Sequence, residues 1–170
     1  SEQLDIYLIF KSKFFVGPGS GLDKIASFFK IPILYVNSFN LSYLPHYIHK
    51  CIYVPNIYYD LKTNKKINFS NQVNPNFKKD ISTNRNLSKY ATLDEFIRND
   101  VKIIYSTSED IENAANEINL LSENKLILSK KETEMQNQFW KIIKINKISQ
   151  NFIISPSFLN NNLDLLKWLF

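Results

Sequence analysis

All three glycines of the 170-residue chain, Gly17, Gly19 and Gly21, lie within five positions of one another. A short apolar run, Phe14–Val16, precedes them, and a helical pattern of apolar residues follows over Leu22–Lys30. This arrangement predicts a strand, a tight turn and a helix in immediate succession. Because glycine adopts positive φ and lets a ligand approach the backbone, the turn is the first candidate for a binding site.

The segment after this helix predicts a parallel sheet. Pro32 ends the helix, and Ile33–Val36 has the pattern of an apolar strand that stops at Asn37. Two short apolar strands joined through a helix form a βαβ unit. We therefore expect an α/β fold, with a Rossmann-like parallel sheet and flanking helices in one domain over residues 1–170.

The pattern weakens between about residues 38 and 91, where prolines, asparagines and serines mark a long irregular connection. We expect Asn71–Ser88 to be its most mobile stretch. Residues 4–10 predict a short, mostly buried element whose type the periodicity does not decide. The other expected elements are strands at 51–54, 66–69 and 101–105, helices at 92–99, about 131–145 and 157–170, and a helix capped by Thr107–Asp110.

The composition limits the classes of partner. The net charge is +5, but only Arg85 and Arg98 of the 21 basic residues are arginine, the residue best suited to phosphate and base contacts. Lysine, asparagine and isoleucine share A/T-rich codons, so the basic excess does not indicate a nucleic acid partner. No stretch approaches the roughly 20 apolar residues that cross a bilayer, and no basic region marks a signal peptide. We expect a chain without a transmembrane segment.

Motifs for metal binding and hydrolysis are missing from the sequence. The single cysteine, Cys51, allows no intramolecular disulfide and no paired-cysteine metal site, and we interpret it as a small hydrophobe. His46 and His49 are three residues apart, but a structural zinc site normally needs four ligands. Gly17–Gly21 has glycine, not serine, at its centre, so it is no nucleophile elbow. We expect no metal and no cofactor, and we name no catalytic residue.

The glycine turn has the chemistry of an anion site. N–H groups at the start of a helix lack partners within the helix, and the helix dipole adds partial positive charge there. Ser20 supplies a hydroxyl donor, and together with Asp23 it forms a start that resembles a capping box. The spacing differs from GxGxxG and from the Walker motif. We expect a phosphate-bearing ligand, with an inert strand-to-helix turn as the alternative.

From Lys13 to Leu22 the sequence resembles a group of bacterial glycosyltransferases of the GT-B type. These enzymes typically have an aromatic strand, a Gly-x-x-Ser-Gly-Leu turn, a helix, and a strand that begins after proline and ends in asparagine. The same order continues here to Pro32 and Asn37. Further segments that are similar to this group are residues 53–55, 67–69, 101–118, 139–140 and 155–159.

The resemblance implies that the chain is the C-terminal, nucleotide-sugar-binding half of such a glycosyltransferase, with a Rossmann-like fold. The enzyme would transfer a hexosyl or related group from a nucleotide-diphosphate sugar to a glycan or other cell-surface acceptor, as in polysaccharide biosynthesis. It would act in the cytoplasm or peripherally at the inner face of the membrane. The resemblance also implies an N-terminal domain, outside this chain, that binds the acceptor. We therefore expect donor binding without independent turnover.

The donor site is expected at the glycine turn and at the end of the strand that follows it. Backbone N–H groups of residues 19–22 would hold the diphosphate, and Asn37 would lie in the crevice where open α/β sheets bind ligands. The residues expected to bind the donor are Gly19, Ser20, Gly21, Leu22, Asn37 and His46, with Tyr43 and Lys50 as further neighbours.

Other functions stay open at this point. A nucleotide-sugar epimerase shares the fold and a Ser-Gly phosphate turn, but it needs no acceptor. A non-enzymatic module would instead bind a partner through the aromatic, lysine-rich residues 38–91. A nucleic-acid binder is the least favoured class, because its hallmark arginines are nearly missing.

Overall fold

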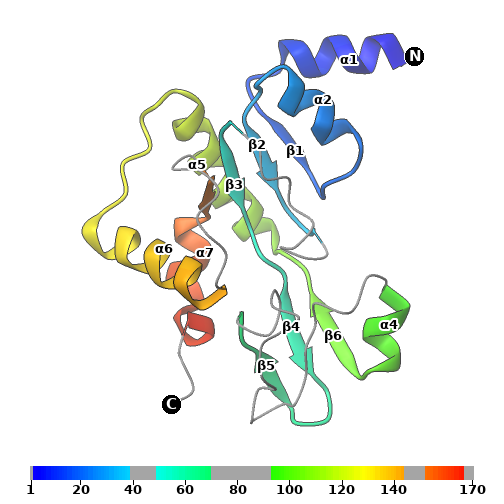
Figure 1. The fold of residues 1–170 in the computed structure, drawn as a ribbon, viewed down its shortest axis with the longest axis vertical. Helices are drawn as coiled ribbons and strands as arrows, with labels where there is room; N and C mark the ends of the chain where they lie inside the picture. The colour runs from blue at the N-terminus through cyan, green and yellow to red at the C-terminus, as the bar shows by residue number, and fades with distance from the viewer. Residues whose placement is uncertain (1, 39–48, 70–92, 144–151, 167–170) are drawn as a thin grey trace.

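The structure is a computed structural model that describes residues 2–38, 49–69, 93–143 and 152–166 (Figure 1). The predicted mobile stretch Asn71–Ser88, the site candidates His46 and Tyr43, and the capping residue Thr92 lie outside these ranges. The described elements are α1 (Glu2–Lys11), β1 (Phe15–Gly17), α2 (Leu22–Phe28), β2 (Ile33–Tyr35), β3 (Cys51–Tyr53), β4 (Ile57–Asp60), β5 (Lys65–Ile67), α4 (Leu93–Arg98), β6 (Val101–Ile104), α5 (Ser108–Ser122), α6 (Lys130–Ile143), β7 (Phe152–Ile154), α7 (Pro156–Asn161) and the 3-10 helix η3 (Leu163–Leu166).

A four-stranded parallel sheet in the order β1-β2-β3-β7 organises the larger part of the fold. Every residue of β2, β3 and β7 is buried, which is the expected result for parallel strands covered on both faces. Figure 1 shows α5 crossing behind β2 and β3, while α2 lies beside β1 and α1 contacts α2. The prediction of a mixed α/β fold with a parallel sheet and flanking helices is confirmed, and the arrangement is compatible with a Rossmann-like fold.

A second sheet, in the order β5-β4-β6, is antiparallel. In β6 the buried residues Val101 and Ile103 alternate with exposed Lys102 and Ile104, so one face of this sheet is covered and the other is open. The buried side packs Tyr58, Ile67 and Phe96 together with β6. Neither β4 nor a second sheet was predicted from the sequence.

The two sheets share one extended segment. The chain leaves the parallel sheet at Tyr53, passes through Val54–Asn56, and enters the antiparallel sheet at Ile57. The segment is buried from residue 51 to residue 56, so this crossing belongs to the core. The 38–91 connection, which we expected to be irregular, is therefore largely regular over its described residues 49–69.

β7 forms one edge of the parallel sheet, and a side chain from α6 covers it. The amide of Gln136 donates from Nε2 to the Ile154 carbonyl at 2.6 Å and accepts the Ile154 N–H on Oε1 at 3.0 Å. Gln136 is 2% exposed. Its side chain therefore takes the place that a further strand would have at this edge.

An aromatic group joins α6 and β7 to the segment after β5. The Phe69 and Phe139 rings meet edge to face at 5.1 Å between centroids, and Trp140 packs against Phe139 at 5.5 Å and against Phe152 at 5.4 Å. Phe69, Phe139 and Phe152 are fully buried. Strand β7 was not predicted from the sequence, although its three residues are part of this core.

The first helix corrects one expectation. We expected residues 4–10 to be mostly buried, but Ile9 is the only buried residue of α1. The helix contacts α2, chiefly through the ring of Phe10, which meets Phe29 edge to face at 5.1 Å. Most apolar side chains of this helix are therefore exposed on the surface of the described structure.

The predicted start of α5 is confirmed. The Thr107 hydroxyl accepts the Asp110 N–H at 3.1 Å, and the Asp110 carboxylate accepts the Thr107 N–H at 2.9 Å, so both halves of the capping box are present. Ala114, Ile118 and Leu121, spaced four and three residues apart, form its buried stripe. Over its described residues, the last predicted helix is divided into α7 and η3.

Candidate functional site

The carboxyl ends of the four parallel strands meet at one edge of the sheet. The glycine turn follows β1, residues 36–38 follow β2, and residues 54–56 follow β3. Ser155, fully buried, follows β7 and donates its N–H to the Tyr53 carbonyl at 2.9 Å. In open α/β folds this edge is where ligands bind. The described order β1-β2-β3-β7 does not reverse, so within the described strands the edge itself, and not a switch point, defines the candidate site.

The glycine turn lies against the end of β2. Gly19 has φ +89, a conformation that favours glycine, and a Cβ added there would lie 3.6 Å from both the Ser38 Oγ and a ring carbon of Tyr35. The backbone N–H groups of residues 19–22 donate to no acceptor within the described residues. All four of these residues are exposed. The turn therefore presents a row of free donors beside Ser38.

The start of α2 corrects the expected capping box. Gly21, not Ser20, is the N-cap residue, and no side chain caps this helix. The Asp23 side chain turns inward, where its Oδ2 accepts the Tyr35 hydroxyl at 2.7 Å, because Tyr35 is buried and needs a partner. Asp23 is 3% exposed, and its Oδ1 has no hydrogen-bond partner. The negative charge of a carboxylate in the first turn offsets the partial positive charge of the helix start. Binding of an anion there therefore depends on the free N–H groups.

Asn37 has a structural contact that the sequence did not reveal. It adopts φ +55 at the end of β2, and its Oδ1 accepts the Ser106 N–H at 3.0 Å. This bond joins the end of β2 to the residues between β6 and α5. The beginning of α5 therefore lies at the same edge as the glycine turn. The amide nitrogen of Asn37 is the part of this side chain that stays available for a ligand.

Asn56 adds a buried polar side chain at the same edge. Its Nδ2 donates to the Ser38 carbonyl at 2.8 Å, and the residue is 1% exposed. Its Oδ1 is buried without a hydrogen-bond partner. An unpaired buried oxygen is uncommon in folded proteins, and it indicates a place where water or a polar ligand group binds. Asn56 holds the residue next to Asn37, so the ends of β2 and β3 form one unit.

A second polar group surrounds the start of α7. The Glu117 Oε1 accepts the Ser157 N–H at 2.9 Å, and the Ser155 side chain caps α7 by accepting the Phe158 N–H at 3.3 Å. Burial raises the pKa of Glu117, while hydrogen bonds from Ser155 and Ser157 lower it in part and the charge of Glu132 raises it. This carboxyl can therefore hold a proton more readily than an exposed glutamate.

The structure separates Lys50 from the other predicted site residues. Lys50 precedes β3 and lies at the amino edge of the sheet, where its Nζ donates to the Ser122 carbonyl at 3.1 Å and to the Asn124 Oδ1 at 2.8 Å. It therefore holds the end of α5, and our expectation that it neighbours the glycine turn was wrong. Gly19, Ser20, Gly21, Leu22 and Asn37 are near one another in the fold, whereas His46 and Tyr43 lie outside the described residues.

Two further expectations concern cysteine and metals. Cys51 is buried in β3, as predicted, and burial raises the pKa of its thiol. No three His, Cys, Asp or Glu side chains are placed to hold a metal ion in the part of the chain that the structure describes.

The tyrosines of the middle segment differ in burial. Tyr53 and Tyr58 are buried, and the partly exposed Tyr59 donates to the Asn64 carbonyl at 2.9 Å.

Sequence reasoning missed Ser38 and Asn56 as members of the site. The signal that selected Asn37 was a polar residue directly after an apolar strand, and both missed residues follow strands in the same way. Asn56 was passed over because Pro55 beside it suggested an irregular connection. Glu117 carried no signal, because its spacing in α5 is that of an ordinary polar helix position.

Comparison of the chain with protein-family models, with curated proteins and with solved structures gave no match. Among the described residues, no helix combines the length and the apolar character needed to span a bilayer.

Proposed function

We propose that the chain is the donor-binding part of a glycosyltransferase and that it binds a nucleotide-diphosphate sugar at the carboxyl edge of the parallel sheet. The observation that carries this proposal is the contact between the glycine turn and the end of β2. There, free N–H groups of residues 19–22 lie beside Ser38, which the buried Asn56 holds in place. The GT-B resemblance of the same segment supports the choice of ligand.

The free donors suit a diphosphate. Consecutive backbone N–H groups in a turn form an anion-binding concavity, and Ser20 can add its hydroxyl. When the glycosidic bond to the diphosphate breaks, negative charge grows on the leaving phosphate, and fixed N–H donors stabilise that charge. The catalytic base and the acceptor site belong, in this proposal, to a partner domain.

Gly21 allows a sharp test, because the fold does not require glycine there. Its φ of −51 is helical, and a Cβ added to it meets nothing within 4 Å. Gly21→Ala should therefore leave the thermal unfolding temperature unchanged or slightly higher, while its methyl group occupies the proposed ligand space. We expect calorimetric titration with UDP-, GDP-, ADP- and CMP-sugars to show binding of at least one donor, weakened roughly tenfold or more by Gly21→Ala.

The control is Lys131→Ala, a surface change in the first turn of α6, far along the chain from the site. It should leave donor binding unchanged. If no donor binds to the unmodified chain, or if Gly21→Ala and Lys131→Ala bind the donor equally well, the proposed site is wrong. Product analysis without an acceptor separates a transferase from an epimerase, because only an epimerase would convert the donor.

A further inference from the structure

Helix α1 exposes an unusual amount of apolar surface. Leu4, Ile6, Tyr7, Leu8 and Phe10 are each between 41% and 56% exposed, in a helix of ten residues. Isolated helices this short are marginal in water, and tertiary packing normally stabilises them. With Ile9 as its one buried residue, α1 has little packing within the described structure. Something outside that structure is therefore needed to cover it.

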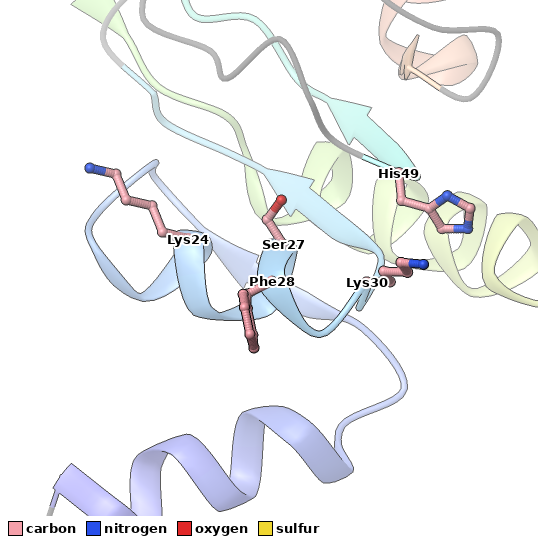
Figure 2. A pocket seen from close by; sticks show the side chains of 5 residues that line it. All are labelled: Lys24, Ser27, Phe28, Lys30 and His49. Carbon is pink, nitrogen blue, oxygen red and sulfur yellow. The ribbon is translucent and has the colours of Figure 1, made fainter.

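The exposed apolar surface continues onto α2. Phe10 meets Phe29 at 5.1 Å, and Phe29 meets Phe28 at 5.3 Å between ring centroids. Phe28 is 81% exposed, and Figure 2 shows it projecting from α2 on the side where α1 lies in that view. An apolar groove of about 400 Å³ runs between the two helices. We call Leu4, Ile6, Tyr7, Leu8, Phe10 and Phe28 the α1–α2 patch.

Positive charges lie beside the aromatic residues of the α1–α2 patch. The Lys11 Nζ lies 5.2 Å from the centroid of the Phe10 ring and 5.9 Å from that of Tyr7, so the cation lies among the exposed aromatics. Beside Phe28, a hollow of about 530 Å³ is lined by Lys24, Lys30 and His49 (Figure 2). Lys11, Lys24 and Lys30 form no salt bridge with the acidic residues of the described structure.

The acidic residues of α1 face away from most of this patch. Asp5 and Glu2 are four and seven residues from Ile9, so they share the side of the helix that carries the buried residue. Leu4, Leu8 and Lys11 share a different side by the same spacing. The helix thus separates its carboxylates from Leu4, Tyr7 and Lys11, whereas Ile6, four residues from Glu2, and Leu8, three residues from Asp5, lie at the margin of the acidic side.

We propose that the α1–α2 patch docks on the surface of an anionic lipid bilayer. Apolar and aromatic side chains with lysines at their margin are the composition of helices that lie in the membrane interface. Lysines near the surface are attracted by anionic headgroups, and Lys24 and Lys30 line the hollow beside Phe28. A second copy of the chain fits less well, because pairing the two patches would bring Lys11, Lys24 and Lys30 of both copies together.

The test is sedimentation of the full chain with vesicles of phosphatidylcholine, with and without phosphatidylglycerol. We expect binding to the anionic vesicles and little binding to the neutral ones. Phe28→Ser should weaken the partition coefficient by at least roughly tenfold, because a large apolar side chain no longer enters the interface. Lys24→Ala and Lys30→Ala should weaken it by roughly fivefold each, and added salt should act in the same direction.

Two matched controls distinguish docking through the α1–α2 patch from nonspecific adsorption to the vesicles. Ile127→Ser removes an apolar side chain that is 88% exposed on the connection between α5 and α6, and Lys131→Ala removes a lysine of α6. Both should leave the partition coefficient unchanged. Equal binding to both vesicle types, equal effects of the patch and control variants, or a dimer in sedimentation velocity that Phe28→Ser dissolves would each overturn the proposal. None of these readouts involves a nucleotide sugar, so they are independent of the donor site.

Discussion

Asp23 and Tyr35 form a polar contact at the boundary between the core and the candidate site. The Tyr35 hydroxyl reaches Asp23 across 2.7 Å, and both residues are buried. Gly19 lies directly against the Tyr35 ring, so the same tyrosine supports the glycine turn. A single residue of β2 thus fixes both the first turn of α2 and the conformation of the proposed phosphate-binding loop.

Removing the Tyr35 hydroxyl should be costly. Tyr35→Phe leaves the buried Asp23 carboxylate without its donor, which destabilises the fold by about 1–3 kcal/mol. Urea unfolding measures this change. In a double-mutant cycle with Asp23→Ala, the two effects should be strongly non-additive, because both variants remove the same contact. Additive effects would show that the hydrogen bond contributes little.

Glu117 predicts a pH dependence of stability. Burial raises its pKa above the ordinary 4.5, so the folded chain holds the proton more tightly than the unfolded chain. Its unfavourable ionisation therefore lowers stability as pH rises from about 4.5 through the raised pKa. Glu117→Gln keeps an acceptor for the Ser157 N–H but cannot ionise. We expect the stability of this variant, relative to that of the unmodified chain, to be higher at neutral pH than at pH near 4.5.

Glu123→Gln is the matched control with the opposite sign. Hydrogen bonds from Lys125 and Lys13, together with their charges, lower the pKa of this exposed carboxyl to about 2. Its favourable ionisation is present above the ordinary pKa and is lost as pH falls towards about 2. Solvent screening keeps the contribution small. Parallel pH profiles of the two variants would contradict the assignment of Glu117 as a partly buried carboxyl with a raised pKa.

At the scale of residues, sequence reasoning worked where the chemistry was local. The capping box of Thr107 and Asp110 spans four consecutive residues, so its pattern is readable directly. The same rule failed at Ser20 and Asp23, because Tyr35, twelve residues away, binds Asp23. Contacts such as Asn37 with Ser106 join distant positions, and one sequence carries no sign of them.

At the scale of elements, Gln136 closes the edge of the parallel sheet at β7. Gln136→Leu keeps the volume but leaves the N–H and carbonyl of Ile154 unpaired inside the protein. We expect a loss of about 2–5 kcal/mol of unfolding free energy, since each unpaired buried group costs about 1–3 kcal/mol. Chemical denaturation measures the loss, and a faster rate of amide exchange at Ile154 would accompany it.

Gln138→Leu, two residues along α6, is the control for this prediction. Gln138 is exposed and makes one bond, from its Nε2 to the Leu166 carbonyl at 2.9 Å. Its replacement should cost no more than about 1 kcal/mol. Equal losses of unfolding free energy for the two variants would mean that the two hydrogen bonds between Gln136 and β7 contribute no more to stability than the one bond of Gln138.

The elements that the sequence predicted differ from those it missed in a physical way. β1, α2 and β2 form a compact βαβ unit with glycine and proline at its boundaries, so each boundary is marked. β7 has three residues, too few to show a period, and its partner β3 lies far back in the chain. β4 follows Pro55 and Asn56, which suggested a loop, although they lie in an extended crossing between two sheets.

At the scale of the whole molecule, Phe69 joins the chain beyond β5 to α6 and α7. Its ring meets Phe139 at 5.1 Å and Phe158 at 6.3 Å, and it is fully buried. Phe69→Ala should therefore lower the unfolding free energy by about 3–5 kcal/mol. Phe28→Ala makes the same chemical change at the most exposed phenylalanine of the α1–α2 patch, and it should change stability by about 0.5 kcal/mol or less. Thermal unfolding of the pair checks both values.

The pairing of β3 with β7 has a consequence for the synthesis of the chain. Cys51 lies beside Phe152, so a ribosome that has made β3 must add about a hundred further residues before its neighbour exists. Until then the edge of β3 that faces β7 has backbone groups without their later partners. The sheet is thus completed late, at the edge that is translated last, and a nascent chain halted before β7 would be a natural client for chaperones.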